Sequence, residues 1–335
     1  MITTNINADI LLVRNTLRGL ALLQRLRALE RPRPVYYLAL LVFWLAAILG
    51  AWLLVIHGSL ALLPLALLLF ASGQRFLGNS LHDASHGNLG LRCNDLLGSW
   101  LLAPLMFENL RHYTKLHMEH HRFLGDSKKD PDYLSLPTGC SASACKVYLK
   151  VLLSPRRWRG SVLADLPNLS LPQRVAIVGW WAGFHTVLAL LDGPSAALWF
   201  GGLWLASRSM TYHALKTFTE LADHGGLPVG TILSRTRNSP DNFLSLLLHP
   251  HHDNFHLTHH LAPGIPMINL RKAHHILLNV PAYRDGHQCD SYFWGHRSVI
   301  QSWVAYQSAQ HDLHQLAVAH PSGTDDNRQT QAPCD

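Results

Sequence analysis

Charged residues are scarce in this chain of 335 residues. Lys, Arg, Asp and Glu make up only 15% of the sequence, against roughly 25% in soluble globular domains. Between Tyr36 and Gln74 there are no charged residues at all. A helix that crosses a bilayer needs about 20 mostly apolar residues, so this run has room for two crossings with a break near His57-Gly58-Ser59. The length of the run argues against a pair of buried helices in a soluble protein.

A second apolar pair follows later in the chain. It is broken at Asp192-Gly193-Pro194, and Arg208 interrupts its last part. We therefore expect an all-α integral membrane protein with four transmembrane helices in two hairpins, forming a membrane domain over residues 35–305. The expected spans are about 36–56, 60–79, 175–191 and 196–218.

Paired cysteines and a signal peptide are also missing. The five cysteines show no paired spacing of the kind that binds metals, so free cytosolic thiols are the default. They are Cys93, Cys140, Cys145, Cys289 and Cys334. Because the N-terminus lacks a short apolar segment with a small-residue cleavage site, we expect no cleavable signal peptide.

Positive charge is concentrated before the first expected span, whereas the two short hairpin turns carry none. The positive-inside rule then places the N-terminus in the cytoplasm, and four crossings place the C-terminus there too. We expect the bacterial inner membrane as the location and no nucleic-acid partner, because the net charge of +7 fits anionic headgroups and acidic carriers. The arginines before the first span are Arg14, Arg18, Arg25, Arg27, Arg31 and Arg33.

The two ends of the chain differ from the membrane domain. Residues 1–34 are expected to form an N-terminal amphipathic cytosolic segment. A helix over residues 9–30 would place Ile10, Val13 and Leu17 on one face, which could lie in the membrane interface or pack as part of an ordinary solvated cap. Residues 306–335 form a polar C-terminal tail, and its last part has the composition of a disordered segment.

Three histidine clusters are the most informative pattern in the chain. They are spaced as HxxxH, HxxHH and HxxHH, and residues three or four apart on a helix share a face. Each cluster would then direct its imidazoles to one point in space. Eight imidazoles are more than one metal ion can use, so the pattern predicts two ions, and nitrogen ligands without cysteine suit iron, zinc, copper or nickel. The eight are His82, His86, His117, His120, His121, His256, His259 and His260.

Two other classes of protein could use such histidines. A metal transporter would place its ligands within the spans near the membrane midplane, whereas these clusters flank the spans. A zinc hydrolase normally carries His-Glu-x-x-His, which is absent from this sequence. After the second cluster, Asp130 and Asp132 could hydrogen-bond ligand imidazoles or simply form a solvated acidic turn.

The order hairpin, HxxxH, HxxHH, hairpin, HxxHH resembles the membrane fatty-acid desaturase superfamily over about residues 36–280. The second cluster and the Lys129-Asp130-Pro131-Asp132 that follows it look like that family's second box and its acidic motif. The stretch from His249-Pro250-His251 through Asn254 to His260 looks like the third box. Because this box begins with His256 rather than glutamine, the chain departs from the front-end subgroup.

The resemblance implies four transmembrane helices under a cytosolic helical cap that carries the histidine boxes, with two irons held at the junction. It also implies a ninth ligand after the fourth span, where this chain has His224. Glu220, one turn earlier, matches a position where some members place a polar residue near the metal. Asp83 and Asn254 are further candidates for groups beside the ligands.

The function implied by this resemblance is O₂-dependent desaturation of a fatty acyl chain, carried as a lipid or a thioester, with two Fe ions as cofactors. No His-Pro-Gly-Gly haem motif occurs, so electrons would come from an external donor such as a ferredoxin-like protein or a small cytochrome. A hydroxylase, acetylenase or ketolase of a lipid or carotenoid could use the same ligands. The candidate walls of an apolar substrate tunnel are Trp180, Trp181, Phe184, Trp199 and Trp204.

Overall fold

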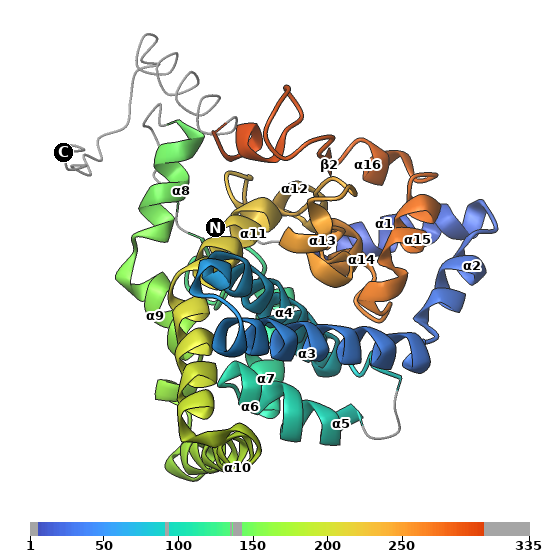
Figure 1. Ribbon diagram of the computed structural model, residues 1–335. Helices are drawn as coiled ribbons and strands as arrows, with labels where there is room; N and C mark the ends of the chain where they lie inside the picture. Colours follow the sequence, from blue (N-terminus) through green and yellow to red (C-terminus); the bar gives the residue numbers. More distant parts are fainter. Residues whose placement is uncertain (1–5, 91–93, 135, 137–142, 305–335) are drawn as a thin grey trace.

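The computed structural model describes residues 6–90, 94–134, 136 and 143–304, and helices dominate it (Figure 1). Three helical stretches are long and apolar enough to cross a membrane, namely Pro34–His57, Leu60–Ser85 and Leu171–His224. The first is α3 (Pro34–His57), the second contains α4 (Leu63–Ser85), and the third joins α10 (Leu171–Ser209) to α11 (Thr211–His224). The prediction of a helical membrane protein is therefore confirmed.

Helices α3 and α4 form the first hairpin. Each has a proline in its first turn, where the missing N–H costs no hydrogen bond, and the chain reverses at Gly58 and Ser59 as predicted. The helices approach each other closely at Gly73, where a Cβ atom would lie 2.7 Å from the Ile48 side chain. Only a glycine permits this approach without displacing its neighbour.

Helix α10 contains the second hairpin. Asp192 and Gly193 leave helical geometry, with φ at +87° for Gly193, a left-handed conformation that glycine adopts without strain. Beyond this point the chain folds back on itself, because the ring centroids of Phe184 and Phe200 lie 5.1 Å apart. α10 is thus two helices joined at the predicted Asp192-Gly193-Pro194 turn.

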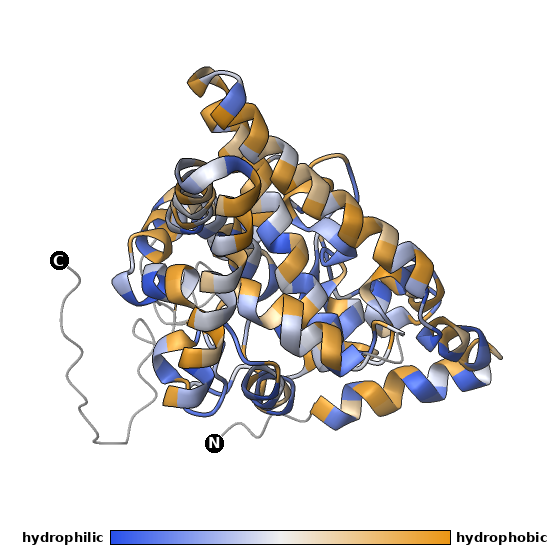
Figure 2. Cartoon of the chain, turned by 60° about the horizontal axis from the view of Figure 1, so that its bottom comes forward, coloured by the Kyte–Doolittle hydropathy of each residue, from blue (hydrophilic) through white to orange (hydrophobic). Residues whose placement is uncertain are grey.

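The two hairpin turns lie side by side. The Nε2 atom of His57, at the end of α3, is 2.9 Å from Oδ2 of Asp192. Large apolar side chains on both hairpins point outward, among them Val42 (65% exposed) and Leu190 (82% exposed). The helices that project from the body of the molecule are largely hydrophobic (Figure 2), and apolar surface of this extent is typical of a membrane or protein contact.

The helix that carries the third histidine cluster packs against the N-terminal segment. α14 (His256–Leu261) and α15 (Met267–Leu277) share a core with α1 (Ile6–Gly19), which buries Val13 and Leu17. The predicted single helix over residues 9–30 is wrong. The chain breaks at Ala21, where φ is +56°, and resumes as α2 (Leu23–Arg27). The face of α1 that carries Val13 and Leu17 packs against protein, whereas Leu11 and Leu12 on the same helix are exposed.

Shorter elements complete the described chain. A π-helical turn, Gly98–Leu102, and two parallel strands, β1 (Arg237–Asn238) and β2 (His287–Gln288), depart from regular α-helix. The predicted polar tail 306–335 and the cysteines at 93, 140 and 334 lie outside the described residues, while Cys145 and Cys289 are free thiols. The remaining helices are α5 (Asn94–Leu97), α6 (Ala103–Met106), α7 (Leu110–Phe123), α8 (Ala144–Leu152), α9 (Pro155–Leu163), α12 (Ile232–Arg235), α13 (Ser245–Leu248) and α16 (Pro281–Arg284).

Candidate metal centre

The structure brings all nine candidate histidines together in two adjoining groups. Four helices supply them: α4 and its C-cap, α7, α11 and α14. The five-histidine group contains His82, His86, His117, His121 and His259. The four-histidine group contains His120, His224, His256 and His260. In each group the candidate ligand atoms lie within 4.8 Å of one another, close enough to surround one ion.

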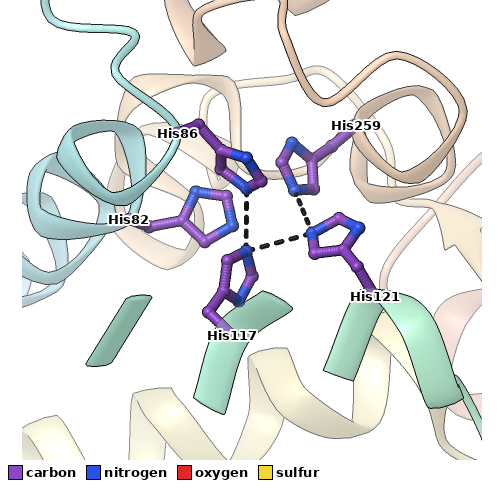
Figure 3. A group of neighbouring side chains, drawn as sticks. All are labelled: His82, His86, His117, His121 and His259. Carbon is purple, nitrogen blue, oxygen red and sulfur yellow. Dashed lines mark hydrogen bonds between the residues drawn. The ribbon is translucent and has the colours of Figure 1, made fainter. Parts of the chain in front are cut away.

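The five-histidine group is drawn in Figure 3, where its side chains point toward one another from α4, α7 and α14. The Nε2 atom of His117 lies 2.9 Å from that of His86 and 3.0 Å from that of His121. His259 closes the group at 3.0 Å from His121, again through Nε2. Both nitrogens of His82 are buried without a hydrogen-bond partner in the described chain.

The four-histidine group contains the histidines of the second and third clusters that do not belong to the five-histidine group, together with His224. The Nε2 atom of His256 lies 2.9 Å from that of His224 and 3.0 Å from that of His260. The ring of His120 lies 5.1 Å, centroid to centroid, from the rings of both His224 and His260.

The expectation that each cluster serves a single point in space is therefore wrong. An HxxHH cluster on a helix at about 100° per residue keeps its first and last histidines, four apart, nearly in line. The middle histidine is rotated by about 100° from the last one. His117 and His121 accordingly face one group while His120 faces the other. In α14, His256 and His260 stay together and His259 joins the opposite group.

Burial keeps most of these imidazoles neutral, the form that binds metal ions. Desolvation lowers the pKa of His86 to about 4 and that of His256 to about 3. His120 differs. Burial has the largest single effect and lowers its pKa, but the hydrogen bond to Asp130 and the charges of Asp130 and Asp132 together raise that pKa by more. That bond joins His120 Nδ1 to the carboxylate at 2.8 Å, so the other ring nitrogen remains available to the group.

The contacts between imidazoles fit a cation better than hydrogen bonds. A neutral imidazole nitrogen has either one proton or one lone pair, yet the Nε2 atoms of His117, His121 and His256 each face two others. Ligand nitrogens about 2.1 Å from an ion and at right angles to each other are about 3.0 Å apart, and tetrahedral ones about 3.4 Å. The observed 2.9–3.0 Å and the five donors of the larger group fit an ion with more than four ligands.

The predicted supporting residues have different surroundings. Asp130 holds His120 and also accepts a hydrogen bond from the Gly125 amide at 2.8 Å, so it ties the ligand to the loop after α7. Asp132 approaches His120 only to 4.0 Å and its side chain is 64% exposed.

Among the described residues, Glu220, Asp83 and Asn254 make no hydrogen bond or ion pair with the nine histidines. Glu220 pairs with Lys216 at 3.3 Å, and Asp83 accepts from the Met267 amide at 3.2 Å. Asn254 donates to the backbone carbonyls of Ser239 and Pro240. In the part of the chain that the structure describes, these three residues support the fold around the centre rather than the imidazoles.

Two supporting groups were missed from sequence. The Arg235 carbonyl lies 3.0 Å from Nδ1 of His224, and a backbone contact of this kind leaves no trace in a sequence pattern. Asp223 Oδ2 lies 4.0 Å from Nδ1 of His256, as far as Asp132 lies from His120, but the Asp223 side chain is only 12% exposed. Its position directly before His224 was the signal that could have identified it.

A cavity of about 510 Å³ borders both groups, touching His82, His117, His120, His224 and His256. The aromatic side chains expected to wall a substrate tunnel do not line it. Trp181 and Trp204 instead line a separate apolar pocket of about 380 Å³, together with Phe107. The Arg208 guanidinium, which faces the cavity, lies over the Phe107 ring at 4.8 Å and so stands between the two spaces.

The chain is similar in sequence to a known protein family and to individual enzymes. Residues 58–292 match the family described as fatty acid desaturase. The chain is 31% identical over 255 residues to dihydrorhizobitoxine desaturase of Bradyrhizobium elkanii, which covers 66% of this chain and 69% of that protein. It is also 31% identical over 120 residues to a beta-carotene ketolase of Haematococcus lacustris, covering 35% of this chain and 31% of the ketolase.

Proposed function

The chain belongs to the fatty acid desaturase family and is an oxidoreductase, and on that premise we propose that it is an O₂-dependent desaturase with two iron ions held by its nine histidines. The observation that carries the proposal is the pair of converging histidine groups on one cavity. The reaction would remove one hydrogen from each of two neighbouring carbons and reduce O₂ to water. An external donor would supply the electrons, as the sequence predicts.

The five-histidine group would hold one ion and the four-histidine group the other. Bound iron would supply the redox chemistry that activates O₂ and cleaves an unactivated C–H bond. The chain's own residues fix the imidazoles. Asp130 holds the Nδ1 proton of His120, and the Arg235 carbonyl accepts from Nδ1 of His224, so both rings present Nε2 to the site.

For the membrane we propose four crossings, with α10 supplying two of them, and both termini in the cytoplasm. The turn at Gly193 and the contact between His57 and Asp192 support this arrangement, as does the arginine-rich segment before α3. Reporter fusions at the two ends of the chain test it. Both reporters should be active on the cytoplasmic side, and opposite locations would contradict four crossings.

The predicted acyl substrate remains a proposal, and the reaction has one rival. The similarity to a beta-carotene ketolase supports oxygen insertion as the second candidate. The two differ in product, because desaturation removes two hydrogens whereas hydroxylation or ketolation adds oxygen.

The experiment is mass spectrometry of small metabolites and lipids from cells with and without the chain, under air and under nitrogen. We expect a product that lacks two hydrogens and depends on both O₂ and the chain. His86→Ala and His256→Ala, one from each group, should abolish it. An O₂-independent product, or an unchanged product in both variants, would contradict the proposal.

A further inference from the structure

The cavity beside the histidines is strongly charged. Four cationic and six acidic side chains line it. Several of them follow one face of α10 and α11 at intervals of about four residues, from Arg208 through Tyr212 and Lys216 to Glu220. Ionisable groups on a membrane-associated helix that face a cavity mark a substrate or ion path.

Such a lining is a poor match for a hydrocarbon chain. An acyl tail packed here would remove water from charged groups without offering them a hydrogen bond, which is costly. It is also a poor match for a polyphosphate carrier, because the acidic side chains outnumber the cationic ones and like charges repel. The volume of about 510 Å³ is within the range of small-molecule pockets, about 300–1,000 Å³.

Four of the charged groups form two ion pairs. Arg75 lies 2.5 Å from Asp253, and Lys216 lies 3.3 Å from Glu220. The two charges in each pair neutralise each other, so these four residues make the cavity polar without attracting a charged ligand.

Arg208 has no such partner. Its side chain is buried, with 1% of the residue exposed. Nε donates to the Val162 carbonyl at 2.9 Å, and the guanidinium lies over the rings of Phe107 and Tyr212. No carboxylate lies within ion-pair distance of it among the described residues. The Nη1 atom has only the weak acceptor Met106 Sδ, at 4.0 Å. A buried guanidinium that lies over aromatic rings and has no stronger partner for its Nη atoms in the described chain suits a ligand carboxylate.

Glu108 is the acidic counterpart of Arg208 in the lining of this cavity. Its Oε2 atom is buried without a hydrogen-bond partner in the described chain, and no described cation lies within ion-pair distance. Burial raises the pKa of Glu108 to about 8, and Lys216 and Arg208 are the cations close enough to oppose that rise. A buried polar atom left unsatisfied calls for an explanation, and a ligand cation would supply one.

We propose, building on the function proposed above, that this cavity binds a compact zwitterion of the amino-acid type, with its carboxylate on Arg208 and its ammonium group on Glu108. The carbon chain of the ligand would extend toward the histidines, where its C–H bonds would react. The substrate would then differ in class from the acyl chain predicted from sequence.

The test measures binding to the purified full-length protein, loaded with iron under nitrogen and held in lipid nanodiscs. Three probes of similar length separate the charges: L-norleucine carries both, hexanoate only the carboxylate and pentylamine only the ammonium group. Calorimetry should show norleucine binding at least about tenfold more tightly than either of the others, because hexanoate leaves Glu108 without a partner and pentylamine leaves Arg208 without one. Stearoyl-coenzyme A should not compete with norleucine.

Two variants locate the charges. Glu108→Gln should reduce the preference for norleucine over hexanoate, and Arg208→Leu the preference for norleucine over pentylamine, each by about tenfold. A ratio of affinities within one variant does not depend on how much of the protein is folded. Arg174→Leu is the matched control, because this α10 arginine also donates through Nε to a backbone carbonyl, at 2.8 Å from Leu169, but lies outside the cavity.

The outcomes separate this inference from the proposed function. If norleucine does not bind, or binds no better than hexanoate and pentylamine, the inference is overturned. If stearoyl-coenzyme A binds more tightly than norleucine and is desaturated, the proposed function stands and the inference falls. If norleucine binds with the expected charge dependence but neither it nor any acyl thioester yields an O₂-dependent product, the inference stands and the proposed function fails.

Discussion

The two histidine groups differ in how their imidazoles are held. In the four-histidine group, Asp130 and the Arg235 carbonyl hold Nδ1 of His120 and His224. In the five-histidine group, no Nδ1 atom forms a hydrogen bond within the described chain, and those of His82 and His259 are buried without a partner. The five-histidine group has more candidate ligands, whereas two rings of the four-histidine group are held by hydrogen bonds at Nδ1. The two groups should therefore respond differently to the same kind of substitution.

The comparison suggests where the centre is most vulnerable. Losing one ligand leaves four in the larger group, still enough for a closed metal site, but only three in the smaller group. Ring orientation also matters more where there are fewer ligands, because each contributes a larger share of the binding energy. We therefore expect the largest losses of metal from substitutions in the four-histidine group.

His224→Ala should have the largest effect. It removes a buried ligand candidate from the four-histidine group, so we expect product formation to fall to background and the iron content to drop from two toward one per chain. Elemental analysis and product assay give the two values. His185→Ala is the control, because this histidine contacts the Trp181 carbonyl within α10 and belongs to neither group. Full iron and normal turnover in His224→Ala would remove His224 from the ligand set.

His86→Ala should cost less metal than His224→Ala, although product formation should still be abolished. It leaves His82, His117, His121 and His259 around the first ion. The measurement is iron retained after dialysis against a chelator, with both variants treated in parallel. Equal or greater loss from His86→Ala would show that ligand number does not set the difference between the groups.

Asp130→Asn should have an intermediate effect confined to the four-histidine group. Removal of a carboxylate partner of a ligand imidazole typically costs roughly 10–100-fold in metal affinity or activity. Asp132→Asn is the matched control, because that carboxylate lies 4.0 Å from His120 and is largely exposed. Iron titration of the two variants should separate them, and identical affinities would mean that the hydrogen bond to His120 is not needed.

Glu220→Gln should leave the metal content unchanged. The side chain pairs with Lys216 and Arg157, not with an imidazole, so its removal should affect only the charge of the cavity. A loss of iron in this variant would mean that Glu220 approaches the ions once they are bound.

The sequence was a good guide where the signal is local. Long stretches with few or no charged residues predicted where the hairpins lie, and Asp192-Gly193-Pro194 marked the turn inside α10. The three clusters supplied eight of the nine converging histidines. His224 stands alone in the sequence, so only the resemblance to a family pointed to it.

What could not be predicted depends on how helices cross. Helical geometry separates the middle histidine of each HxxHH cluster from the other two, but which group each histidine joins depends on where α4, α11 and α14 meet α7. The charged cavity is lined by Arg75 from α4, by Glu108 just before α7 and by Arg208 from α10. No spacing in the sequence relates these three residues, so an apolar tunnel lined by tryptophans was the natural expectation.

The number of iron ions in the active protein is the most direct test of whether the two histidine groups hold one ion each. The purified chain is reconstituted with iron under nitrogen, freed of loosely bound metal, and analysed for iron per chain alongside turnover. Two converging histidine groups predict two irons per chain in active protein, and one in His224→Ala. Active protein with at most one metal ion per chain would contradict a two-iron centre.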